Sequence, residues 1–137
     1  MQLIHHPDSV VIVPVDGDEL VLVRQLRPGA NGHTLELPSG KIDPGESPAE
    51  AAARELAEEC GLAAREWREL GCFWAAPAYS TEYVHVWEAR ALHPSDPAEF
   101  DEDEDVEVER FPASGELKAV SDASSVAALA LWRDAAG

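Results

Sequence analysis

The first third of the chain alternates between apolar segments and turn residues. Residues 9–15 are mostly β-branched, an Asp-Gly-Asp turn follows, and residues 20–25 are apolar again. This pattern is typical of a β-hairpin. Residues 34–37 predict a further short strand that ends at Pro38, and the Gly- and Pro-rich residues 39–47 predict a loop.

A capped helix is predicted over residues 48–60. Ser47 provides a capping oxygen, Pro48 suits the first helical position, and Glu50 completes a capping box with Ser47. Gly61 stands where a left-handed residue commonly ends a helix. Both ends of this helix are therefore defined by the sequence.

The second half of the chain predicts further strands. Residues 69–75 and 83–92 have strand composition, and the polar residues 76–82 connect them. Eight of the eleven residues 99–109 are acidic, and two valines alternate with glutamates near the end of this segment. That alternation predicts a loop that becomes an edge or surface strand.

A final amphipathic helix is expected from a cap at Ser121 or Asp122 to about Asp134. The predicted order is strands, helix, strands, helix. This order favours the α/β class, with a mixed sheet between helical layers.

Length and charge narrow the functional classes. The 137 residues fit a single domain, residues 1–137. The formal net charge of -17 disfavours binding to nucleic acid or to an anionic membrane, so a polyanionic substrate would require a bound divalent cation. No segment has the roughly 20 apolar residues that span a bilayer, and no signal peptide is evident, so we expect a cytoplasmic protein.

The two cysteines, Cys60 and Cys72, have neither CxxC spacing nor histidines close to them in the sequence. Such spacing argues against a disulfide framework or a zinc site. The sequence instead predicts buried thiols.

Three carboxylates gather on the predicted helix. Glu55, Glu58 and Glu59 are three and four residues apart and share one face, and Arg54 is the only cation of the helix. Mg²⁺ prefers such oxygen ligands together with substrate phosphates. The same residues are also compatible with an ordinary acidic surface helix.

A wider spacing pattern surrounds these glutamates. From Gly40 the chain has five residues, Glu46, seven residues, Arg54-Glu55-Leu56, one residue, Glu58-Glu59, one residue and Gly61, followed by an aliphatic residue. This pattern resembles the signature of the Nudix hydrolases at every defined position. The resemblance implies an α/β/α sandwich with a mixed sheet that hydrolyses a nucleoside diphosphate linked to another group, with Mg²⁺ or Mn²⁺ as cofactor.

The resemblance also implies site roles. The implied principal metal ligands are Glu55 and Glu59, and the implied supporting ligands are Glu58, Ser39 and Gly40. Arg54 would orient the carboxylates and, together with Glu58, belong to the catalytic residues. Glu46 would support the metal ligands without contacting the metal itself.

Flanking residues are similar to those of ADP-ribose pyrophosphatases. Segments 24–28 and 36–46 resemble the entry to the signature in that subfamily, and Pro77 lies fifteen residues past Leu62, as its marker proline does. This similarity implies hydrolysis of ADP-ribose, or of a related nucleoside diphosphate sugar, to AMP and ribose 5-phosphate. The implied substrate-binding residues are Arg27, Glu36, Pro77, Tyr79 and Glu82.

The sequence leaves two alternatives open. Tyr79 stands where a tyrosine is associated with dinucleoside polyphosphate hydrolases, and Ala78 replaces the glycine that usually follows Pro77. The chain therefore has a rival interpretation as a hydrolase of dinucleoside polyphosphates, nucleoside triphosphates or another nucleotide cofactor. A non-catalytic nucleotide-binding module is the other alternative, although no glutamate of the signature is missing.

Further expectations concern the general base and the assembly. By resemblance, Glu102 of the acidic segment matches the catalytic base of ADP-ribose pyrophosphatases, with Glu104 as the second candidate. Arg27 would grip a phosphate or form a surface salt bridge. About eight residues precede the first predicted strand. In relatives of this subfamily a longer N-terminal region helps to form the dimer and the adenosine pocket. We expect a homodimer despite this shorter segment.

Overall fold

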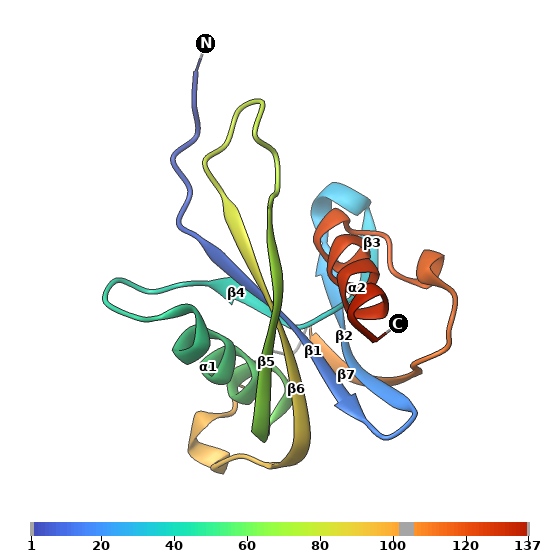
Figure 1. Ribbon diagram of the computed structural model, residues 1–137. Helices are drawn as coiled ribbons and strands as arrows, with labels where there is room; N and C mark the ends of the chain where they lie inside the picture. The colour runs from blue at the N-terminus through green and yellow to red at the C-terminus, as the bar shows by residue number, and fades with distance from the viewer. Residues whose placement is uncertain (1, 102–105, 137) are drawn as a thin grey trace.

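A computed structural model describes residues 2–101 and 106–136. The path of the chain is shown in Figure 1. The strands are β1 (Ser9–Asp16), β2 (Glu19–Arg27), β3 (Gly32–Glu36), β4 (Ser39–Lys41), β5 (Leu62–Trp74), β6 (Tyr83–Pro94) and β7 (Val106–Pro112), and the helices are α1 (Pro48–Cys60) and α2 (Ala123–Ala136).

The sheet is mixed, as the sequence predicts. Its strand order is β3-β2-β1-β6-β5, with β4 added to β1 and β7 added to β2. Strand β1 runs parallel to β6 and antiparallel to β2 and β4. The predicted hairpin is confirmed, but β1 and β2 pair only beside their turn and then diverge, so that each strand joins different partners.

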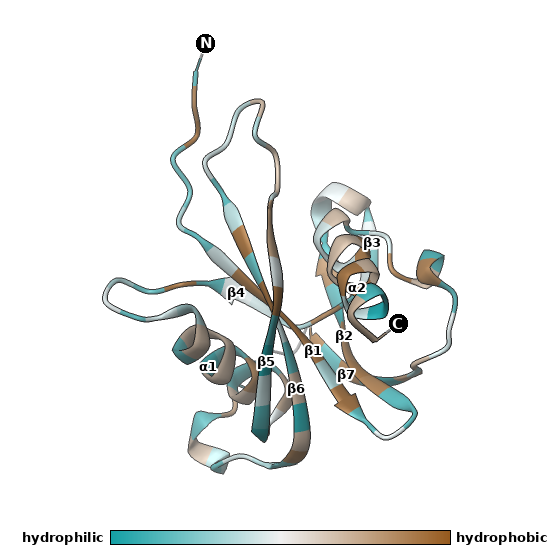
Figure 2. Cartoon of the chain, in the orientation of Figure 1, coloured by the Kyte–Doolittle hydropathy of each residue, from teal (hydrophilic) through white to brown (hydrophobic). Residues whose placement is uncertain are grey.

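The two helices lie on opposite faces of the sheet (Figure 1). Alternate residues of β1 point to opposite sides: Val10 and Ile12 pack in a cluster with Leu56 of α1, whereas Val11 and Val13 pack in a second cluster with Leu129 of α2. This alternation follows from the two-residue period of a strand. Hydrophobic residues accordingly lie along the central strands between the helices (Figure 2), and the predicted α/β/α sandwich is confirmed.

Helix α1 has the predicted bounds. The Ser47 side chain accepts from the backbone N–H of Glu50, the Glu50 side chain accepts from the backbone N–H of Ser47, and Gly61 ends the helix at φ 67°. Ala51 and Leu56 are among the residues on its buried face. The capped ends fix which residues face the sheet, and therefore which ones face the solvent and the site.

Two predictions of local structure are wrong. Residues 39–41 form strand β4 rather than a loop, because their backbone pairs with β1. Strand β5 begins at Leu62, seven residues before the predicted start, because its polar first half pairs with the end of the long strand β6. The other expected strands are present, and Asp122 caps α2 by accepting from the backbone N–H of Ser125 at 3.0 Å.

Neither helix in residues 2–101 and 106–136 combines the length and apolar character needed to cross a lipid bilayer.

Candidate active site

Arg54 connects the loop before α1 with the helix and with β4. Its Nε and Nη2 donate to Glu46 at 2.8 and 2.9 Å, and its Nη1 donates to Glu55 at 2.8 Å and to Glu58 at 3.2 Å. Nη2 also donates to the backbone oxygen of Lys41 at 2.9 Å. One guanidinium thus holds three of the predicted carboxylates: Glu46 from the loop, and Glu55 and Glu58, which share a face of the helix as the spacing predicts.

The charge state of this network follows from its hydrogen bonds. Donation by Arg54, together with a backbone N–H from Asp43, lowers the pKa of Glu46 to about 2. The hydrogen bond with Glu46 also raises the pKa of Arg54 above its ordinary value. Both groups therefore keep their charges at neutral pH.

Glu55 and Glu59 lie deeper than Glu58. Burial, and then the nearby Glu55 carboxylate, raise the pKa of Glu59 to about 8, and burial raises the pKa of Glu55. The backbone N–H of Ser39 donates to Glu59 at 3.3 Å, which joins β4 to the helix. Crowded, partly desolvated carboxylates make a set of oxygen donors that fits a hard cation such as Mg²⁺ or Mn²⁺.

Gly40 leaves room for the Glu55 side chain. A Cβ at this position would overlap the Glu55 carboxylate. A side chain at position 40 would therefore displace this carboxylate, which gives a physical reason for a glycine at the start of the pattern.

Gly40 lines one hollow, and Glu55, the residue it faces, lines another. A cavity of about 520 Å³ is lined by Gly40 and Ser39 together with Arg27, Glu36 and Glu82. A smaller hollow of about 150 Å³ is lined by the three helix carboxylates Glu55, Glu58 and Glu59, and by Gln25, Asp101 and Val106. The larger cavity is within the size range of small-molecule sites. Two residues of its wall reach the carboxylates of α1: Gly40 faces Glu55, and the backbone N–H of Ser39 donates to Glu59.

Arg27 and Glu36 form an ion pair in the wall of the larger cavity. Arg27 donates through Nε at 2.8 Å and through Nη2 at 2.9 Å, and Thr34 donates to the same carboxylate. Burial works to raise the pKa of Glu36, which is only 4% exposed, but the bonds from Arg27 and Thr34 outweigh it and hold the pKa below its ordinary value. The salt bridge expected as one alternative for Arg27 is present, with a buried partner.

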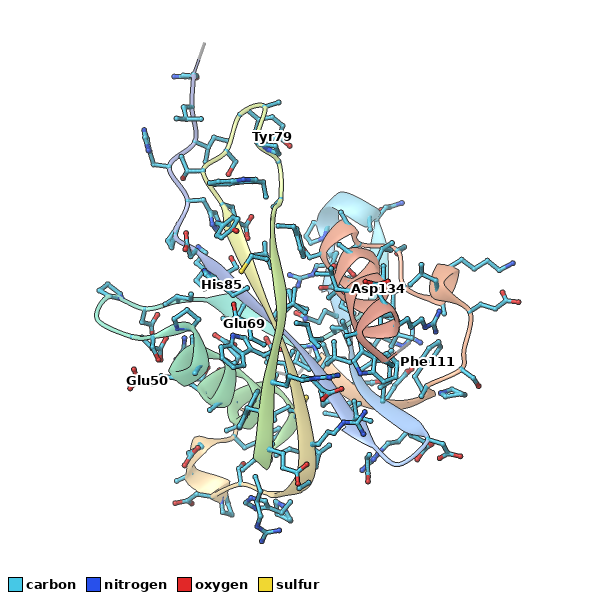
Figure 3. All side chains as sticks on the ribbon, in the orientation of Figure 1. Glu50, Glu69, Tyr79, His85, Phe111 and Asp134 are labelled. Atoms are coloured by element: carbon cyan, nitrogen blue, oxygen red, sulfur yellow. The ribbon has the colours of Figure 1, made fainter. Side chains whose placement is uncertain are left out.

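The remaining substrate-binding candidates are divided between two places. Glu82 lines the larger cavity and accepts from Ser9 Oγ at 2.5 Å. Pro77 instead lines a separate hollow of about 510 Å³ beside Trp74. Tyr79 is 54% exposed at the end of the loop between β5 and β6 (Figure 3) and does not line the larger cavity.

Glu102 and Glu104 lie outside the described residues. Their neighbour Asp101 donates its backbone N–H to the carbonyl of Glu58 at 2.9 Å, so the acidic segment begins beside the carboxylates of α1. Sequence reasoning missed Asp122 as a member of the cavity wall. The Oδ1 atom of Asp122 is buried and has no hydrogen-bond partner within residues 2–101 and 106–136, and burial raises the pKa of this carboxyl group. The only sequence signal for Asp122 was its position as a helix cap.

A family model of the NUDIX domain matches residues 5–129. The chain belongs to the Nudix family. The resemblance stated from the signature is thereby confirmed.

Individual relatives of this Nudix chain carry more specific names. It is 35% identical over 121 residues to the ADP-ribose pyrophosphatase of Bacillus subtilis, covering 87% of this chain and 65% of the relative. It is 36% identical over 132 residues to the ADP compounds hydrolase NudE of Escherichia coli, covering 93% of this chain and 70% of the relative. The chain thus spans about two thirds of the length of these relatives.

Solved structures agree on the architecture. The crystal structure of an ADP compounds hydrolase superposes with a TM-score of 0.83 at 34% identity, covering 93% of this chain and 71% of the other. A NUDIX hydrolase from Nitrosomonas europaea superposes with a TM-score of 0.76 at 20% identity, covering 95% and 90%. The second likeness concerns the fold alone.

Proposed function

We propose that this chain is an enzyme that hydrolyses the diphosphate of ADP-ribose, or of a related nucleoside diphosphate sugar, to AMP and ribose 5-phosphate. The observation that carries the proposal is the contact between Gly40, in the wall of the 520 Å³ cavity, and the Glu55 carboxylate of α1. The names of the relatives from Bacillus subtilis and Escherichia coli support the choice of substrate.

The proposal assigns a divalent cation, Mg²⁺ or Mn²⁺, to the carboxylates of α1. Glu55 and Glu59 would be the principal ligands, with Glu58 and the backbone at Ser39 and Gly40 in support. Such a cation, when bound, neutralises phosphate charge, polarises the phosphorus and lowers the pKa of a water ligand.

Two arginines of the chain would position the metal-binding carboxylates and the substrate. Arg54 keeps Glu46, Glu55 and Glu58 in a fixed arrangement, so little reorganisation is needed when substrate binds. Arg27 lines the cavity, where its guanidinium would face the diphosphate in a chain that is otherwise strongly acidic. Glu36 holds Arg27 in that position through two hydrogen bonds.

Glu102 remains the candidate for the base that takes a proton from the attacking water, with Glu104 second. Glu102→Gln should lower kcat by roughly 10² to 10⁴ with little change in KM, since general-base effects are of that size. Glu104→Gln is the matched variant in the same segment. Loss of kcat in Glu104→Gln alone would exchange the roles, and normal kcat in both would place the base elsewhere.

A substrate panel tests the proposal directly. The purified chain with Mg²⁺ is given ADP-ribose, a dinucleoside tetraphosphate, a nucleoside triphosphate and an oxidised nicotinamide dinucleotide, and the products are identified by anion-exchange chromatography. We expect the highest kcat/KM for ADP-ribose, with AMP and ribose 5-phosphate as products. A higher kcat/KM for another substrate would assign the rival enzyme class, and tight binding without hydrolysis would assign a binding module.

We further propose that the protein acts in the cytoplasm as a homodimer and has no nucleic-acid partner. The net charge of -17 supports the last point. Sedimentation velocity at several protein concentrations tests the dimer: a single species with the mass of one chain at every concentration would exclude it.

A further inference from the structure

A β-bulge brings two potential metal ligands to one face of β5. Glu69 is opposite Trp87 of β6, Gly71 is opposite Val86, and Cys72 is opposite His85, so that one residue of β5 is inserted between Glu69 and Gly71. In a regular strand, residues three apart point to opposite faces, and one inserted residue reverses this. Gly71 supports the bulge with φ 146°, a conformation that disfavours other residues.

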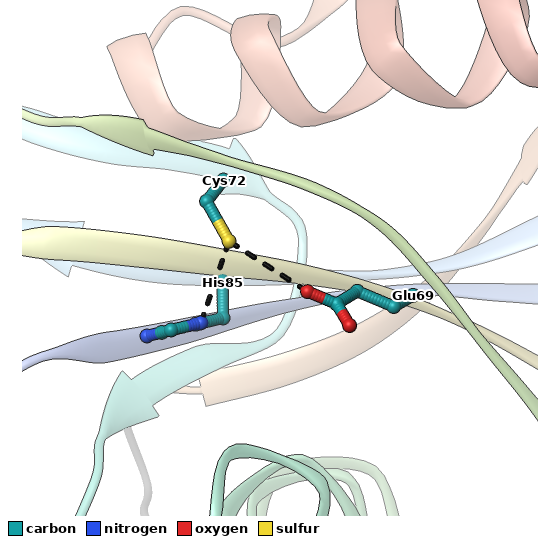
Figure 4. Close-up of side chains that lie close together, drawn as sticks. All are labelled: Glu69, Cys72 and His85. Atoms are coloured by element: carbon teal, nitrogen blue, oxygen red, sulfur yellow. Dashed lines mark hydrogen bonds between the residues drawn. The ribbon is translucent and has the colours of Figure 1, made fainter.

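The resulting cluster contains three types of ligand atom (Figure 4). Cys72 Sγ lies 3.4 Å from His85 Nδ1 and 3.8 Å from Glu69 Oε1, and one ligand atom from each residue falls within 4.8 Å of the others. Tetrahedral Zn²⁺ has bonds of about 2.3 Å to sulfur and about 2.0–2.1 Å to nitrogen and oxygen, which places neighbouring ligands about 3.5 Å apart. The side chains are therefore already near the spacing of a tetrahedral site.

Asp8 adds an independent feature of a metal site. Its Oδ2 lies 3.1 Å from Nε2 of His85, on the side of the ring away from Cys72. A carboxylate that accepts from one ring nitrogen fixes the tautomer in which the other nitrogen offers its lone pair, which is the usual arrangement behind a metal-binding histidine. In this tautomer the lone pair of Nδ1 faces the cluster.

We propose that Glu69, Cys72 and His85 form a second metal site, selective for Zn²⁺ and similar transition ions, with Asp8 as the positioning residue of His85. Thiolate and imidazole ligands suit Zn²⁺, whereas the all-oxygen set of α1 suits Mg²⁺. A reactive cysteine paired with His85 is the competing interpretation, but the adjacent Glu69 carboxylate opposes an anionic nucleophile and complements a cation.

The site shares no residue with the proposed hydrolase site. Its ligands come from β5 and β6, and Asp8 comes from the segment that leads into β1. A bound ion would therefore connect β5 to β6 by side chains and stabilise the folded chain by an amount that rises with the logarithm of the free ion concentration above Kd.

Cobalt provides the probe, because a thiolate bound to Co²⁺ gives a charge-transfer band in the near ultraviolet and a tetrahedral ion gives intense visible bands. The chain is freed of metal by chelation, Mg²⁺ is added in excess to occupy the oxygen ligands of α1, and Co²⁺ is titrated in. We expect both bands to saturate at one Co²⁺ per chain and to disappear when Zn²⁺ is added. The readout needs no substrate, so its failure is distinct from failure of the proposed hydrolysis.

Matched variants locate the ion. Cys72→Ser should abolish the charge-transfer band, whereas Cys60→Ser, which changes the other thiol, should retain it. Asp8→Asn should keep the band but weaken Co²⁺ binding about 10- to 100-fold. Absence of the band in the wild type, its persistence in Cys72→Ser, or its loss in Cys60→Ser would overturn the site, and unchanged affinity in Asp8→Asn would remove Asp8 from it.

Discussion

The contact between Gly40 and Glu55 makes Gly40→Ala an informative single change. The added methyl group would overlap the Glu55 carboxylate, which Arg54 already holds by a hydrogen bond of 2.8 Å. The backbone of Gly40 does not occupy the left-handed region, so alanine meets no backbone strain there. The substitution therefore tests one steric contact between β4 and α1.

The expected effects differ in size for stability and for activity. Overpacking costs about 1–3 kcal/mol, and the lower chain entropy of alanine in the unfolded state returns about 0.4–1 kcal/mol. The net loss should lower Tm by about 2–8 °C and leave the protein folded at 25 °C. Relief of the overlap requires the carboxylate or the strand to move by about 1 Å, and a misplacement of that size lowers kcat/KM by about 10²-fold.

The assay compares hydrolysis of ADP-ribose at saturating Mg²⁺ with thermal unfolding of the same samples. Gly32→Ala is the matched control, because a Cβ at Gly32 meets no atom within 4 Å and the backbone is not left-handed. We expect Gly32→Ala to keep wild-type turnover. A kcat/KM for Gly40→Ala within about threefold of wild type would refute the conclusion that this contact organises the carboxylates.

Three further predictions concern single side chains. Glu55→Gln and Glu59→Gln should each remove most of the Mg²⁺-dependent activity without lowering Tm, because each relieves repulsion between crowded carboxylates; a lowered Tm would contradict this. Arg27→Ala should raise KM for ADP-ribose and lower Tm at pH 7. The folded pKa of Glu36 lies below the ordinary value of 4.5, so its ion pair with Arg27 stabilises the folded protein fully above pH 4.5 and less as the pH falls through the folded pKa. The Tm difference between Arg27→Ala and wild type should therefore narrow in acid. A difference that stays constant with pH would refute the pairing. Tyr79→Ala should change the kcat/KM ratio of ADP-ribose to dinucleoside tetraphosphate only modestly, because the ring lies outside the larger cavity; loss of a dinucleoside preference would contradict this.

The sequence by itself determined those elements that depend only on residues a few positions apart. Helix α1 has its predicted bounds because the capping box at Ser47 and the left-handed Gly61 act within a few residues of the helix ends. The shared face of Glu55 and Glu58 follows from helical spacing alone. The Asp-Gly-Asp turn between β1 and β2 was likewise readable from its composition.

Tertiary structure decided what depends on residues distant in the sequence. Strand β4 exists because β1 offers it a backbone ladder, and the early start of β5 depends on pairing with β6. The spacing rules for cysteine and histidine argued against a zinc site, yet the β5–β6 register and its bulge set Cys72 beside His85. Periodicity along one chain segment carries no information about cross-strand register, since register is fixed by which surfaces become buried when the strands meet.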